Sequence, residues 1–84
     1  MPTVLRVDGF RVLILLPPRE HGPPHVHVVK NDGVAVVRLE DASKGISHKV
    51  VRVERMRLAD LRAAERIVAA HTVELLGRWR ELHG

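Results

Sequence analysis

Two Asp-Gly pairs divide the first half of this chain and limit what it can fold into. Asp8-Gly9 and Asp32-Gly33 are each flanked by β-branched and apolar residues, which is the strongest short-range signal for a β-hairpin. We therefore expect two hairpins, one over residues 3–16 and one over residues 25–40.

In the first hairpin, a two-residue turn makes residues 3–7 run antiparallel to residues 10–16. Alternate side chains of a strand share a face, so this register gathers one face that we expect in the core. Its members are Thr3, Leu5, Val7, Phe10, Val12 and Ile14. On the opposite face, Arg6 lies across from Arg11.

In the second hairpin, a two-residue loop joins residues 25–31 to residues 34–40. This register gathers Val26, Val28, Ala35, Val37 and Leu39 on a core face. A three-residue loop would instead place the histidines beside Val37 and Leu39, because a shift of one residue exchanges the faces. We favour the two-residue loop because it separates an apolar face from a mixed polar one.

The polar face of the second hairpin carries the side chains that are candidates for catalysis or ligand binding. We expect His25 and His27 side by side on it, with His27 opposite Arg38 and His25 near Glu40. The loop before them, residues 17–24, contains four prolines, which forbid a helix and fix the chain at low entropic cost. Such a loop can hold His21 over the neighbouring strand.

The last third of the chain changes from strand to helical periodicity. Residues 47–53 alternate as a fifth strand would, and an apolar stripe with helical spacing follows from about Leu58 to Leu82. Gly77 lies inside this stripe, where glycine predicts a weakened point or a close packing contact. We expect an α+β fold in one domain, residues 1–84: a four- or five-stranded antiparallel sheet built from two Asp-Gly hairpins and covered by one long C-terminal helix.

Composition restricts the class of protein. The 84 residues include no cysteine and no apolar run of membrane-spanning length, so we expect a cytoplasmic protein without disulfides. The formal net charge is +4, and arginine supplies most of the basic residues. Arginine suits phosphate and carboxylate partners, although a high-GC coding background gives the same bias.

The histidine loop also carries a family pattern. The chain resembles the small bacterial domain-of-unknown-function 4160 family in its opening residues 1–6, in the stretch from Glu20 to Val28, and in a late helix with Leu75, Leu76 and Trp79. The resemblance implies no established activity. It implies a protein partner encoded by an adjacent gene, in an arrangement similar to toxin–antitoxin pairs.

Three uses of the histidines remain open. As an interaction module, the domain would be the toxin-like member of such a pair, and its unused apolar residues would be buried by that partner or by a homodimer. Those residues are Val4, Leu13, Leu15, Val29 and Val36.

The second use is RNA binding or metal-independent RNA cleavage. Cleavage of this kind needs an acid, a base and cations for the phosphate. His25, His27 and Arg38 are our catalytic candidates, and Arg6, Arg11 and Arg38 our nucleic-acid-binding candidates. The single Phe, the single Trp and the absence of Tyr argue against an aromatic platform for single-stranded RNA.

The third use is metal binding, whereas the first two need no cofactor. His21, His25 and His27 offer three imidazole nitrogens, an acceptable set for zinc or another divalent metal. This spacing indicates a metal site less specifically than a cysteine motif would.

Overall fold

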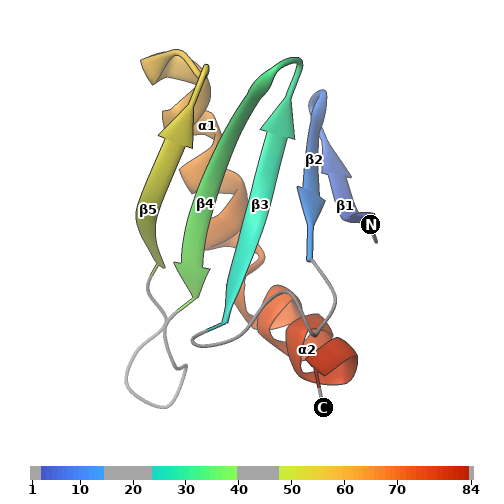
Figure 1. The fold of residues 1–84 in the computed structure, drawn as a ribbon. Helices are drawn as coiled ribbons and strands as arrows, with labels where there is room; N and C mark the ends of the chain where they lie inside the picture. The colour runs from blue at the N-terminus through green and yellow to red at the C-terminus, as the bar shows by residue number, and fades with distance from the viewer. Residues whose placement is uncertain (1–2, 15–23, 40–47, 84) are drawn as a thin grey trace.

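A computed structural model describes residues 3–14, 24–39 and 48–83. Five strands form one antiparallel sheet in chain order, and two helices follow (Figure 1). The elements are β1 (Thr3–Val7), β2 (Phe10–Leu13), β3 (His25–Lys30), β4 (Gly33–Leu39), β5 (His48–Glu54), α1 (Leu58–Ala70) and α2 (Thr72–His83). The expected α+β class and its antiparallel sheet are confirmed.

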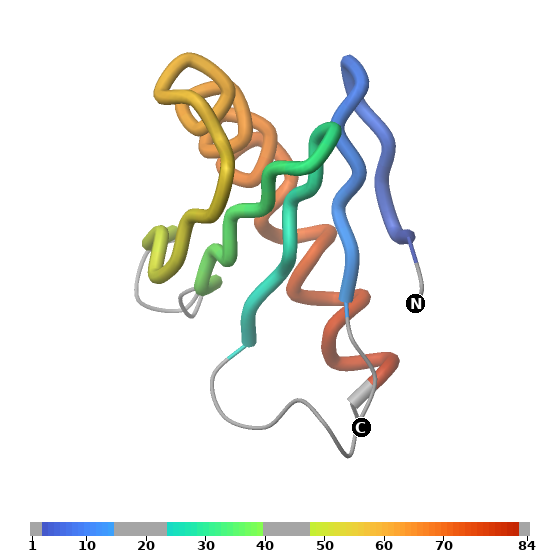
Figure 2. The backbone as a smooth tube through the Cα atoms, turned by 45° about the horizontal axis from the view of Figure 1, so that its top comes forward, coloured from blue at the N-terminus to red at the C-terminus, as the bar shows by residue number. Residues whose placement is uncertain are grey.

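The core lies between one face of the sheet and the helices. α1 passes behind the sheet in Figure 1, and α2 continues past the ends of β2 and β3, as the tube in Figure 2 also shows. The expected core face of the second hairpin is buried here, as are Phe10, Val12 and Ile14 of the first; Leu5 and Val7 are partly buried against the cluster, and Thr3 is not part of it. The core cluster consists of Phe10, Val12, Ile14, Val26, Val28, Ala35, Val37, Leu39, Ala64, Ile67, Val68, Leu75, Leu76 and Trp79. Neither described helix is long and apolar enough to cross a membrane.

The first hairpin has the expected turn and one irregularity. Val7 pairs with Phe10 across Asp8-Gly9, and both turn residues have positive φ, 49° and 83°, as a type I′ turn requires. A bulge between Thr3 and Leu5 shifts the start of β1. As a result Val4, which we expected on the second face, packs against the core.

The second hairpin turns one residue earlier than expected. Its turn residues are Asn31 and Asp32, so that Lys30 pairs with Gly33. Gly33 is the first residue of β4, and this position requires glycine because a Cβ atom there would lie 2.6 Å from the carbonyl oxygen of Arg55. Asn31 adopts the positive φ of 54° instead, which asparagine tolerates better than most residues. The register therefore shifts by two residues in total, and both faces keep their expected members.

The helical region is two helices rather than one. The break falls at His71, where the backbone N–H reaches back three residues to the Val68 oxygen instead of four to the Ile67 oxygen. The His71 ring donates from Nδ1 to that Ile67 oxygen at 2.9 Å, and the buried Thr72 hydroxyl donates to the Val68 oxygen at 2.7 Å. Two side chains thus satisfy carbonyl groups at the break.

Gly77, the expected weak point, lies inside the continuous helix α2. A Cβ atom there would meet nothing within 4 Å, so no close packing contact explains the glycine.

Candidate functional site

The candidate site lies on the sheet face opposite the core, which we call the second face. Strand alternation and the observed register place on it one apolar group and one basic group. The apolar group is Leu13, Val29, Val34 and Val36. The basic group, which also includes one acidic residue, consists of Arg6, Arg11, His25, His27, Arg38, Lys49, Arg52 and Glu54.

His25 and His27 lie side by side, as expected from their spacing in a strand. Their ring centroids are 5.5 Å apart with an interplanar angle of 61°, an edge-to-face geometry that aromatic rings favour. Both residues are half-buried, and the Nδ1 atom of His27 is shielded from solvent. The pair therefore forms part of a packed surface rather than two freely projecting rings.

Trp79 is the third ring of this group. Its ring centroid lies 5.0 Å from that of His25, with the planes tilted by 50°. Trp79 also belongs to the core cluster and is only 7% exposed. We missed this contact from the sequence because the helical stripe predicted only that Trp79 faces the sheet. The contact depends on the direction of α2 after the break at His71.

Arg38 pairs directly with His25 across β3 and β4. We expected His27 in that place, but the earlier turn puts His27 opposite Val36 instead. Glu40, the residue expected near His25, lies outside the described residues. Arg38 is half-buried, and its Nε atom is shielded from solvent without a hydrogen-bond partner in the described structure.

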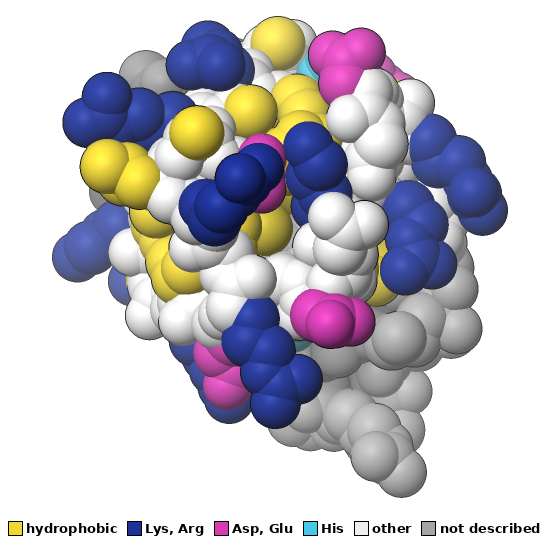
Figure 3. Space-filling model, turned by 90° about the horizontal axis from the view of Figure 1, so that it is seen from above, with side chains coloured by type: hydrophobic (Ala, Val, Ile, Leu, Met, Phe, Trp, Pro, Cys, Tyr) yellow, Lys and Arg dark blue, Asp and Glu magenta, His cyan; other side chains and the backbone are white. Residues whose placement is uncertain are grey.

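Arg6 and Arg11 form the expected cross-strand pair and are both exposed. Like charges directly opposite each other destabilise a sheet, so an anion bound between them would relieve an existing repulsion. Glu54 is the acidic residue placed on this face, and it already accepts a 2.7 Å hydrogen bond from Arg52. Viewed from the end with the hairpin turns, Lys and Arg side chains spread more widely than acidic ones around an apolar area (Figure 3).

The expected metal site of three histidines cannot be built from the described residues alone. His21 belongs to the part of the chain that is not described, and residues 3–14, 24–39 and 48–83 contain no group of three potential metal ligands. His25 and His27 therefore stand as a pair.

The remaining histidines have structural roles where their side chains are described. His48 is half-buried, with Nε2 3.6 Å from a carboxylate oxygen of Glu65 on α1. His71 is half-buried at the helix break.

The fold and this surface define a class: a small α+β domain whose sheet has one face under helices and one basic, histidine-bearing face. The family model described as "Domain of unknown function (DUF4160)" matches residues 9–80, and the chain belongs to that family. No curated protein matches the chain significantly, and neither does any solved structure.

Proposed function

We propose that this chain is a cytoplasmic partner-binding domain, the toxin-like member of a toxin–antitoxin type pair, and that its second face receives an acidic segment of the partner protein. Arg38 carries this proposal. Its Nε atom is buried without an acceptor in the described structure, and an unsatisfied buried donor costs about 1–3 kcal/mol. Nε itself has no exposed surface, so a carboxylate of the partner meets the exposed part of the half-buried Arg38 side chain and forms a charge-assisted hydrogen bond with the guanidinium there.

The charge around Arg38 favours an acidic partner. Lys49 pairs with Arg38 directly, and Arg6 and Arg11 lie on the same face toward the hairpin turns. Glu54, beside Val34 at that same end, is held by Arg52. A face of one sign attracts and orients a partner of the opposite sign. Between the charges lie the half-buried valines 29, 34 and 36, which supply apolar area for the same contact.

A protein fits this face better than single-stranded RNA does. Proteins that bind single-stranded RNA on a sheet stack its bases on exposed aromatic rings. The chain has one Phe, one Trp and no Tyr, and both Phe10 and Trp79 are buried in the core.

RNA binding or metal-independent RNA cleavage is the second candidate, and one observation favours it. The rings of His25 and His27 are 5.5 Å apart, with Arg38 directly opposite His25. One imidazole could act as base and the other as acid, while Arg38 holds the phosphate. A zinc site that includes His21 stays a weaker prediction.

The test uses the purified chain and the purified product of the adjacent small gene, with binding measured by calorimetry. Arg38→Gln should weaken binding about 30-fold or more, because truncating one partner of a buried charged contact has effects of that size. Arg62→Gln on the exposed side of α1 is the matched control and should bind as the wild type. Equal binding by Arg38→Gln and wild type would refute the proposed role of this face.

The same variants distinguish the other occupants. If a random-sequence RNA binds with affinity that falls steeply as salt rises, and the neighbouring protein does not bind, the RNA alternative holds. Sedimentation of the chain alone shows whether a second copy covers the second face. If the chain forms a tight homodimer that Arg38→Gln breaks, the occupant of this face is a second copy and not an acidic partner.

A further inference from the structure

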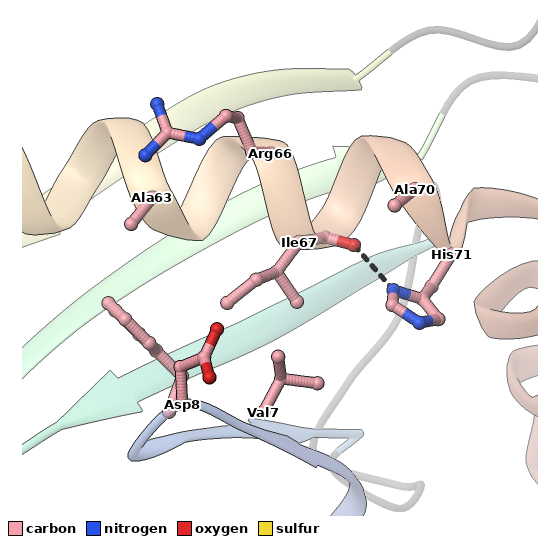
Figure 4. A pocket seen from close by; sticks show the side chains of 8 residues that line it. Val7, Asp8, Ala63, Arg66, Ile67, Ala70 and His71 are labelled. Carbon is pink, nitrogen blue, oxygen red and sulfur yellow. Dashed lines mark hydrogen bonds between the residues drawn. The ribbon is translucent and has the colours of Figure 1, made fainter.

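A separate groove lies between the turn of the first hairpin and α1. Its accessible volume is about 270 Å³, just below the roughly 300 Å³ at which sites for drug-sized molecules begin. The groove therefore suits a single amino-acid residue. Val7 and Asp8 line it from the hairpin, and Ala63, Arg66, Ile67 and Ala70 line it from α1 (Figure 4).

The groove combines an apolar floor with groups of opposite charge. Val7, Phe10 and Ile67 contribute apolar side chains. Asp8 lies on the hairpin and Arg66 on α1, with the guanidinium of Arg66 on the side of α1 away from the hairpin (Figure 4). Arg66 is exposed and forms no ion pair with Asp8 or with any other residue of the described ranges. Because the side chain is exposed and unpaired within the described part of the chain, a change of rotamer can bring the guanidinium donors of Arg66 to a ligand in the groove.

His71 adds a further polar atom to the same groove. A carbonyl oxygen can only accept, so the 2.9 Å contact with the Ile67 oxygen means that Nδ1 carries a proton and donates it. The Nε2 atom of the ring is left for a ligand.

We propose that this groove binds the C-terminal residue of a partner protein chain that ends in an aliphatic residue of about leucine size. Such a residue presents three features in a small space, and the groove has a counterpart for each. The aliphatic side chain lies on the floor, the terminal carboxylate accepts from Arg66, and the amide N–H donates to Asp8. Terminal carboxylates are recognised in comparable ways by peptide-binding domains.

The proposal goes beyond the function proposed for the second face, since no residue of the groove is one of the charged residues of that face. The two proposals can be tested separately, because Arg38→Gln should weaken binding at the second face and leave binding in the groove unchanged.

The experiment is a nitrogen–proton NMR titration of the full chain with N-acetyl-leucine, which mimics a C-terminal leucine. We expect a dissociation constant on the order of 1 mM, appropriate to so small a ligand, with shifts centred on Asp8, Arg66 and His71. N-acetyl-leucinamide, which lacks the carboxylate, and N-acetyl-glycine, which lacks the side chain, should each bind at least about 10-fold more weakly.

Two pairs of variants locate the site. Arg66→Glu should weaken binding at least about 10-fold, whereas Arg62→Glu, one helical turn earlier and outside this groove, should not. Ala70→Trp should fill the groove and abolish binding, whereas Ala69→Trp on the neighbouring exposed position should not. Equal binding of the acid and the amide, or unaltered binding by Ala70→Trp, would overturn the proposal.

Discussion

The ring of Trp79 lies 5.0 Å from the ring of His25, centroid to centroid, although 54 positions separate them along the chain. Trp79 is buried in the core, and His25 is the first residue of β3. The candidate site and the hydrophobic core therefore share one contact. A change in the direction of α2 would alter the surface around the histidine pair.

This contact should be measurable as a coupling energy. In a double-mutant cycle of His25→Ala with Trp79→Phe, we expect an interaction of up to about 0.5–1.5 kcal/mol, the value usual for a packed aromatic pair. The measurement is the free energy of unfolding from urea titrations. His48→Ala with Trp79→Phe is the control cycle, because His48 lies beside Glu65 instead. Equal couplings in the two cycles would show that the ring contact adds nothing specific.

The helix break should depend on Thr72. Its hydroxyl is buried and donates to the Val68 oxygen, so Thr72→Val, which keeps the shape, should lower the free energy of unfolding by about 0.5–1.5 kcal/mol. Val73→Thr changes the neighbouring exposed position and should have an effect within about 0.5 kcal/mol. Chemical denaturation checks both variants, and an unchanged stability of Thr72→Val would contradict the role assigned to the hydroxyl.

Two glycine substitutions should have opposite effects on stability. Gly33→Ala places a Cβ atom 2.6 Å from the Arg55 carbonyl oxygen and should destabilise the fold by about 1–3 kcal/mol. Gly77→Ala meets nothing within 4 Å and should stabilise α2 by about 0.5–1 kcal/mol, because alanine is the better helix former. Thermal unfolding measures both. A stabilising Gly33→Ala would mean that β4 can move away from Arg55 at little cost.

The histidine pair can be tested through the toxin-like role. Expression of the chain should arrest growth, and co-expression of the adjacent small gene should relieve the arrest. The double change His25→Ala and His27→Ala should abolish the arrest while a cooperative unfolding transition is retained. His48→Ala serves as the control because it removes a histidine outside the pair. Arrest by the double variant at the wild-type level would refute a functional role for the pair.

Local patterns predicted the hairpins and the composition of their faces. Asp8-Gly9 supplies the two positive φ angles of its turn, and strand alternation separates His25 and His27 from the core residues on either side. These features follow from backbone geometry within a few residues, so a single sequence contains enough information for them.

The register of the second hairpin was not predictable in the same way. Asp32-Gly33 favours a turn at those two residues, but the approach of Arg55 requires a glycine inside β4. The turn lies at Asn31 and Asp32 instead, so Arg38 pairs with His25 rather than with His27. The faces survived because the register shifts by two residues, an even number.

The sequence by itself determined the α+β class, an antiparallel sheet of four or five strands and the two histidines on one face, because strand and helix periodicities are local properties. Only the tertiary structure decided the break at His71, the packing of Trp79 on His25 and the groove between Asp8 and Arg66. The last two join residues far apart in the chain, so their geometry depends on how the helices pack against the sheet. The break at His71 is made by contacts within one helical turn, but it interrupts an apolar stripe that continues past it.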